Sequence, residues 1–338
     1  MENQRWLWPC IITALVIISL LSVSIGPLHI SPSTSFNAMI NWATQQSLSV
    51  VAPHEQLVIN NVRLPRTLLA LTVGATLAQC GAVMQGLFRN PLADPGIIGV
   101  SSGAALGAAL CIVLFPQGGE YLVAFSAFGA GLLTTLLVYK LASSVSGTSV
   151  VLLLLSGVAV AALAGAGIGL LTYMASDMAL RDLTLWQMGS IAGAQWHYVI
   201  LSLIALALLS WQFTQNANAL NALLLGEAEA RHLGVNVDKL KRKLIVLCAI
   251  GVGIAVAATG IIGFIGLVVP HLIRMLIGPD HKLLLPLSAM LGAAILMLAD
   301  IGARSIVAPS ELPVGLVTAL LGAPFFIVLL LNQRNKLV

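Results

Sequence analysis

The stretch from Leu244 to Ile273 constrains this chain most, because thirty residues pass without an aspartate, glutamate, lysine or arginine. A helix of that length would measure about 45 Å, which is too long for one straight crossing of a bilayer and too short for two full ones. Helix-breaking residues lie near its middle: Gly260, Gly263, Gly266 and Pro270. Glycine and proline favour a break there, so the sequence predicts two short crossings instead of one long helix.

The rest of the chain is also poor in charge. Hydrophobic residues make up 59% of the 338 and charged residues 8%, which is too little charge for the surface of a soluble domain of this size. The apolar segments have helix length and lack the alternation of a membrane β-barrel. We therefore expect an all-α, polytopic membrane protein with about ten transmembrane helices, forming one transmembrane domain over residues 1–338. The expected spans are Leu7–Ile25, Thr67–Leu87, Gly96–Phe115, Tyr121–Val138, Ser149–Met174, Ile191–Gln212, Leu244–Ala258, Ile261–Ile277, Leu283–Ala299 and Pro313–Leu331.

The distribution of lysine and arginine favours ten spans. Two crossings between residues 244 and 277 place twelve of these cations inside and four outside, whereas one crossing gives nine and seven. Because inner loops carry the excess of positive charge, the first topology is preferred. It puts both termini and the polar segment 213–243 in the cytoplasm, and residues 27–65 and 175–190 outside.

The chain carries no motif for chemistry of its own. None of its six lysines follows a glycine, so there is no P-loop for ATP. The four cysteines stand singly in apolar runs, and no basic patch is interleaved with aromatic residues. We therefore expect a chain that is not an enzyme, binds no metal, cofactor or nucleic acid, and relies on a partner if ATP is used. Asp300 and Arg304 are four residues apart and are expected to pair on one helix face, either as a structural ion pair or in a functional role.

Several residues outside or at the ends of the spans are candidates for recognition. Arg63 and Arg66 oppose the charge bias at the outer face, which indicates contact with an acidic partner, or alternatively with lipid headgroups. At the outer end of the expected pathway lie Tyr173, Met174, Met178, Arg181 and His197. Soft and aromatic side chains of this kind suit a flat apolar ligand such as a porphyrin, although interfacial packing explains them equally well.

A series of short motifs occurs in order between residues 63 and 331. They are Arg63-Leu-Pro-Arg66, Gly81-Ala-Val-Met-Gln85 leading into Arg89-Asn-Pro-Leu-Ala-Asp-Pro95, Trp186-x-x-Gly189-Ser190, Leu225-Gly226-x4-Arg231-x-Leu233-Gly234, Gly263-Phe-Ile-Gly-Leu-Val-Val-Pro-His-Leu-Ile-Arg274, Asp280-His281, Ala299-Asp-Ile-Gly-Ala-Arg304, Glu311-Leu-Pro-x-Gly315 and Leu321-Gly-Ala-Pro-Phe325. In these motifs the chain resembles the permease subunits of type II bacterial ABC importers for iron chelates, heme and cobalamin.

The resemblance implies an inverted-repeat fold in the bacterial inner membrane and a homodimer with the pathway between its two copies. It also implies a cytoplasmic ABC ATPase and a periplasmic substrate-binding protein as partners. Docking of the binding protein is assigned to Arg63, Arg66, Arg304 and Glu311. Coupling to the ATPase is assigned to Leu225, Gly226, Glu227, Ala230, Arg231, Leu233 and Gly234, with Arg89 and Asn90. The cytoplasmic gate is assigned to Ser144, Ser146, Gly147, Thr148 and Ser149. The cations of Lys239–Lys243 are expected only to hold the next span at the headgroups.

The substrate is the remaining question. Residues 163–177 and 180–186 look most like the hemin permeases, so heme is the expected substrate. Ferric siderophores and cobalamin are alternatives that use the same mechanism. A secondary transporter that works without an ATPase is the alternative from a different class, and the lack of clear carboxylates at mid-membrane speaks against it.

Overall fold

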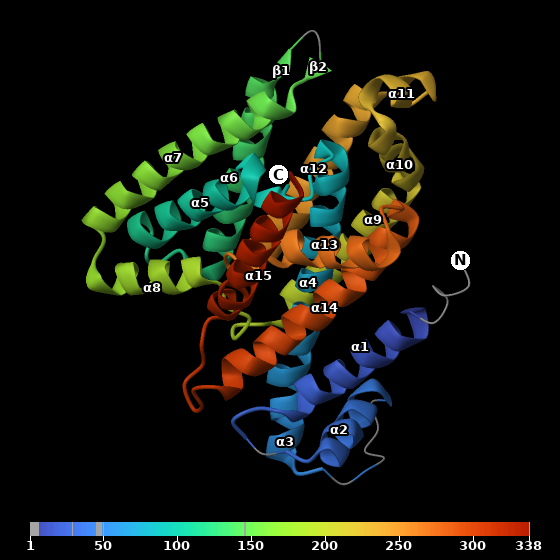
Figure 1. The fold of residues 1–338 in the computed structure, drawn as a ribbon. Helices are drawn as coiled ribbons and strands as arrows, with labels where there is room; N and C mark the ends of the chain where they lie inside the picture. The colour runs from blue at the N-terminus through green and yellow to red at the C-terminus, as the bar shows by residue number, and fades with distance from the viewer. Residues whose placement is uncertain (1–6, 29, 45–48, 50, 145–146, 338) are drawn as a thin grey trace.

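The computed structural model describes residues 7–28, 30–44, 49, 51–144 and 147–337, and nearly all of them are helical (Figure 1). The described residues also contain one short antiparallel hairpin, formed by β1 (Ser143–Ser144) and β2 (Gly147–Thr148) with Ser143 opposite Thr148. The all-α prediction is confirmed, with the hairpin as an addition that the sequence did not indicate.

Ten apolar helices correspond in order to the ten predicted spans. Six helical segments of the described chain are long and apolar enough to cross a membrane, and four apolar helices are shorter. The ten are α1 (Leu7–Ser24), α4 (Leu64–Phe88), α5 (Val100–Leu114), α6 (Gly119–Ala142), α7 (Val150–Met174), α9 (Trp196–Gln215), α12 (Val237–Thr259), α13 (Ile265–Ile277), α14 (His281–Ser305) and α15 (Val314–Leu337).

Short helices cover the two ends of this bundle. They are α2 (Pro32–Thr44), α3 (Pro53–Val58), η2 (Ile59–Arg63), η3 (Pro95–Ile98), α8 (Asp177–Met188), α10 (Ala217–Leu225) and α11 (Glu227–His232). Helices α10 and α11 lie at the same end as the hairpin, and α2 and α3 lie at the opposite end (Figure 1). We call these the hairpin end and the α2–α3 end. The predicted start of the second span, Thr67, is too late, because the helical segment runs without a break from Pro53 to Phe88.

Helix α4 is the core of the bundle, and nearly all of its side chains are buried. Small residues allow its neighbours to approach closely, as is usual where apolar helices meet in a membrane. A Cβ atom on Gly81 would lie only 1.8 Å from the carbonyl oxygen of Gly266 in α13. A side chain at position 81 would therefore force α4 and α13 apart.

The predicted interruption of the long apolar stretch is confirmed at Gly260 and Gly263, since residues 260–264 lie between α12 and α13. The prediction is wrong for Gly266 and Pro270, which lie inside α13. Pro270 has no N–H to donate to the Gly266 carbonyl one turn earlier. Instead, the Gln85 side chain of α4 donates to Gly266 O at 3.5 Å and to Leu267 O at 3.0 Å.

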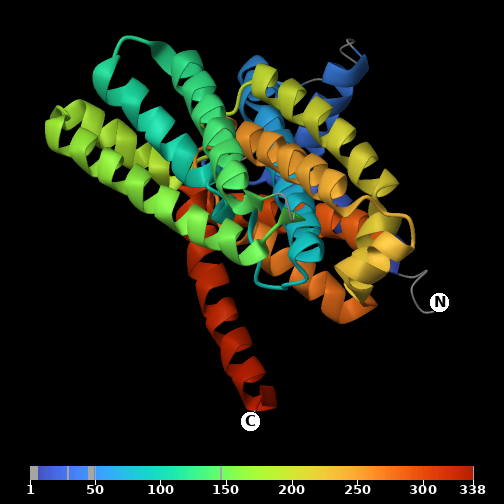
Figure 2. The ribbon, with the colours of Figure 1, turned by 90° about the horizontal axis from the view of Figure 1, so that it is seen from above.

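Helix α7 forms an outer edge of the molecule. Figures 1 and 2 show it beside α5 and α6, with α8 leading back along the same group. Its large side chains Leu155, Val158 and Leu163 are exposed. The monomer thus presents an apolar helix face that no other part of the described chain covers.

Candidate functional site

Arg66 lies in a buried charged cluster at the α2–α3 end. Its Nε donates to both carboxylate oxygens of Asp300 at 2.9 and 3.1 Å, and its Nη1 donates to the Glu311 carboxylate at 2.8 Å. Asp300 is completely buried, and the Arg66 side chain is almost so. Forked contacts of this kind are the strong form of arginine–carboxylate pairing, so Arg66 connects α4 to α14 and to the segment that follows it.

Arg304 and Arg63 tie the end of α1 to the same region. Arg304 lies 3.5 Å from Asp300, which confirms the predicted pair, and it donates to the carbonyl and hydroxyl oxygens of Ser22 at 2.7 and 2.9 Å. Arg63 donates to the carbonyl oxygens of Val23, Ser24 and Leu28. The last carbonyls of a helix have no partner within it and favour nearby cations. The two arginines supply those partners.

The structure thus gives the three arginines partners inside the chain. Each is at most 5% exposed, so in this conformation their guanidinium groups are not presented to a docking protein. Glu311, whose side chain is 31% exposed, is the member of the predicted docking set that reaches the surface. The docking role stays a prediction. Nothing in the local sequence signalled Ser22 or the carbonyls of α1 as partners.

The predicted ATPase-coupling residues lie at the hairpin end, around the junction of α10 and α11. Gly226 joins the two helices with a φ of 131°, which disfavours any residue with a side chain. Ala230 is the buried residue of α11, while Leu225 and Leu233 on either side of this helix are 67% and 65% exposed. Two leucines that flank a short helix outside the apolar bundle make a surface suited to a protein partner.

The other predicted coupling residues surround this junction. Arg89 caps α4 with a left-handed φ of 49°, and its guanidinium lies 4.0 Å from where a Cβ of Gly226 would be. Asn90 is occupied with its own turn, where its side chain accepts from the Leu92 amide at 2.9 Å. Arg231 is exposed and lies 3.4 Å from Asp238, and Gly234 ends the segment with a positive φ.

Helix α10 is fixed to the bundle through Asp280, the N-cap of α14. The Asn221 side chain of α10 donates to the Asp280 carboxylate at 2.6 Å, and the Lys282 amide donates to the same oxygen at 3.0 Å. Burial alone would raise the pKa of this carboxyl, but the two hydrogen bonds and the neighbouring positive charge lower it below its ordinary value.

The predicted gate residues form the hairpin and the start of α7. Gly147 and Thr148 make up β2, and the Ser149 hydroxyl caps α7 by accepting from the Leu152 amide. Ser144 ends β1, and Ser146 lies outside the described residues. The described members of the predicted gate set therefore lie at the same end of the molecule as α10 and α11 (Figure 1).

The prediction that Lys241 anchors the span at the headgroups is wrong. Its side chain is 1% exposed, and its ammonium donates to Glu227 at 2.6 Å and to the Thr148 carbonyl at 3.2 Å. The buried face of α12 here consists of Leu240, Lys241, Leu244, Ile245 and Cys248. That helical spacing is a signal in the sequence that could have assigned Lys241 to the interior.

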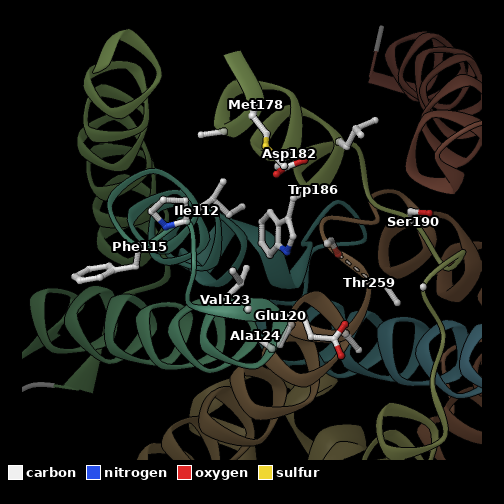
Figure 3. Close-up of a pocket in the computed structure, with 18 of the residues that line it drawn as sticks. Ile112, Phe115, Glu120, Val123, Ala124, Met178, Asp182, Trp186, Ser190 and Thr259 are labelled. Carbon is white, nitrogen blue, oxygen red and sulfur yellow. Dashed lines mark hydrogen bonds between the residues drawn. The ribbon is translucent and has the colours of Figure 1, made fainter. Parts of the chain in front are cut away.

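The predicted pathway residues differ in their surroundings. Met178 lines a cavity of about 560 Å³ between α5, α6, α8 and α12. In Figure 3 the Trp186 indole lies between Met178 and Asp182 on one side and Glu120 on the other. Tyr173 and Met174 are exposed at the end of α7, and Arg181 is exposed on α8. His197 packs against Tyr121 and Tyr198 with ring centroids 5.1 and 4.1 Å apart, and Tyr198 lines the same cavity as Met178.

These features define a class: a helical membrane protein with an apolar bundle and a short helical protrusion at one end. The sequence matches the FecCD transport family over residues 14–332, so the chain belongs to that family.

Relatives with known names agree with this assignment. The chain is 46% identical to the hemin transport system permease protein HmuU of Yersinia pestis, over 95% of this chain and 94% of that one. It is 41% identical to the vitamin B12 import system permease protein BtuC of Escherichia coli, over 99% and 97%. A solved inward-facing structure of a metal-chelate type ABC transporter has a TM-score of 0.85 and 36% identity, and covers 97% of this chain.

Proposed function

We propose that this chain is the permease subunit of an ATP-driven importer that moves heme from the periplasm to the cytoplasm. The observation that carries the proposal is the 46% identity to the hemin permease over nearly the full length of both chains. The cobalamin permease of Halobacterium salinarum is equally similar, but over only 75% of its length. Exposed Tyr173, Met174 and Met178 supply soft and aromatic surface of the kind that suits a porphyrin.

Two copies of the chain form the transport pathway between them. The uncovered apolar face of α7 supports this, because a second copy would cover part of it and leave the rest to line the pathway. The gate residues at the start of α7 then close the cytoplasmic end. The assembly lies in the bacterial inner membrane, with both termini in the cytoplasm.

Energy enters from a separate cytoplasmic ATPase, which binds Leu225, Leu233 and the α10–α11 junction. Rigid-body movement of short helices docked in this way can open and close a helical bundle. A periplasmic binding protein delivers the substrate on the opposite side, to the surface around Arg63, Arg66, Arg304 and Glu311.

Docking of the binding protein is best tested with a variant that does not alter the buried arginines. Reversing Arg63 or Arg66 to glutamate would place a carboxylate among carbonyl oxygens or beside Asp300, so loss of folding would obscure loss of docking. Glu311→Gln keeps the shape of the exposed member. It is expected to weaken association with the binding protein at low salt, where surface charges act most strongly. Unchanged association would remove Glu311 from the docking surface.

The substrate is tested with the purified permease, its ATPase and the binding proteins in proteoliposomes. ATP hydrolysis is measured with binding proteins loaded with heme, with a ferric siderophore or with cobalamin. We expect stimulation by the heme-loaded protein. Stimulation by only a siderophore-loaded or only a cobalamin-loaded protein would overturn the assignment of heme. Cobalamin is the second candidate, because the Escherichia coli vitamin B12 permease is 41% identical over 97% of its length.

A further inference from the structure

Lys241 is a buried cation that connects three separate elements. It belongs to α12, its ammonium donates to Glu227 in the first turn of α11 at 2.6 Å, and it donates to the Thr148 carbonyl in β2 at 3.2 Å. Lysine is almost never fully buried unless it is paired. The Lys241 Nζ atom therefore contacts both α11 and the β1–β2 hairpin.

Stability alone does not explain a lysine in this position. A buried ion pair recovers its desolvation cost only with very good geometry, and an apolar side chain of similar volume often serves as well or better. Lys241 also has exposed neighbours on the same helix, Lys239 and Lys243, which show that this segment can place cations in water. The burial of Lys241 between Glu227 and Thr148 thus creates a specific connection between α11 and β2.

The connection has two separable halves. The contact with Glu227 is an ion pair with a carboxylate whose side chain is 34% exposed. The contact with Thr148 needs an N–H donor, since a carbonyl oxygen only accepts. Thr148 is joined in turn to the inner end of α6, because its hydroxyl lies 3.3 Å from that of Ser143 and 3.4 Å from that of Tyr139.

We propose that Lys241 is a positioning residue that transmits movement of α11 to the β1–β2 hairpin. When the ATPase displaces α11, Glu227 carries the ammonium with it, and the ammonium displaces the hairpin through the Thr148 carbonyl. This inference rests on the proposed function, because it requires an ATPase bound at α11. It adds the specific atoms through which that binding reaches the gate.

The test measures gate movement apart from substrate. Cys10 is exposed whereas Cys80, Cys111 and Cys248 are buried. The test therefore uses a Cys10→Ser, Ser144→Cys background, with a spin label attached at position 144. In the assembled complex, the distance between labels in the two copies is measured with and without ATP. Wild type is expected to show a distance change. Absence of that change in wild type would count against the proposed function itself, and would be seen before any Lys241 variant is made.

Lys241→Met keeps most of the side-chain volume and removes every donor. We expect the complex to assemble and hydrolyse ATP while the ATP-dependent distance change is lost. Lys243→Met, two residues further on the same helix and exposed, is the matched control and should behave as wild type. A distance change of wild-type size in Lys241→Met would overturn the proposal.

A charge exchange distinguishes the contact with Glu227 from the contact with Thr148. It also provides a test if Lys241→Met does not fold. The double variant Glu227→Lys with Lys241→Glu restores an ion pair, but a carboxylate at position 241 cannot donate to the Thr148 carbonyl. It should assemble better than Lys241→Glu alone and still show no distance change. Recovery of the distance change in the double variant would contradict a role for the Thr148 contact.

Discussion

Two buried charged clusters lie at opposite ends of this permease, and they are built differently. In the cluster at the α2–α3 end, which the proposed topology places outside and which we call the outer cluster, Arg66 contacts two carboxylates and Asp300 contacts two arginines. In the cluster at the hairpin end, which we call the inner cluster, Lys241 alone joins Glu227 to Thr148. The outer contacts are shared among several partners and connect helices of the bundle. The inner contacts depend on one ammonium and connect a short protruding helix to a hairpin.

The difference indicates different roles for similar chemistry. Losing one contact in the outer cluster leaves other charges buried without full compensation, which is costly. Losing Lys241 leaves only the partly exposed Glu227, which water can solvate. We therefore expect outer variants to change mainly stability, and inner variants to change mainly the link between ATP hydrolysis and the gate.

The largest effect is expected for Asp300→Asn. Asparagine keeps the shape but removes the charge that faces Arg66 and Arg304, and breaking a buried pair in this way costs about 3–5 kcal/mol. Thermal unfolding of the purified permease in detergent should show a clearly lowered midpoint. Glu311→Gln is the matched control, because its side chain is partly exposed and it contacts the same Arg66. Equal midpoints for Asp300→Asn and wild type would show that the outer cluster does not hold the bundle together.

A smaller effect, on assembly instead of folding, is expected for Leu225→Asp and Leu233→Asp. Both leucines are exposed, so the isolated permease should keep its thermal midpoint. Losing the burial of one leucine costs about 1.5–3 kcal/mol, so ATPase binding should weaken about 10- to 100-fold per substitution. Leu57→Asp, on an exposed leucine of α3 at the opposite end, is the control and should bind the ATPase normally. Normal binding by both test variants would move the ATPase site away from α10 and α11.

The smallest effects on stability are expected at the inner end, for Lys241→Met and Asp238→Asn. Methionine replaces the lysine with an apolar side chain of similar volume, which is often neutral for a buried pair. Asp238 forms an exposed pair with Arg231, and such pairs contribute about 0–1 kcal/mol. A loss of stability at Lys241→Met as large as that at Asp300→Asn would erase the distinction between the two clusters.

The sequence predicted the spans and their class well, because hydropathy depends on composition over a window and not on tertiary contacts. It predicted the Asp300–Arg304 pair because both residues lie on one helix face. It could not predict that Arg66 binds Asp300, since 234 positions separate them. The sequence singled out Arg63 and Arg66, but their position alone did not distinguish an external partner from an internal one.

The contacts of Lys241 could not be predicted from the sequence for the same reason. A cationic run near the start of a span suggests anchoring at the headgroups, and the exposed Lys239 and Lys243 remain consistent with that. Lys241 differs from them only in its helical phase, which places it with Leu244 and Ile245 on the buried face. The hairpin that it contacts is two residues per strand, too short for any periodic signal.

The central claim is that energy reaches this permease from a separate ATPase at the hairpin end. Substrate uptake into proteoliposomes tests it most directly, with the permease alone, with the ATPase, and with the ATPase plus ATP, each in the presence of loaded binding protein. We predict uptake only in the last condition. Sustained uptake by the permease alone, driven by an ion gradient, would contradict the claim and identify a secondary transporter.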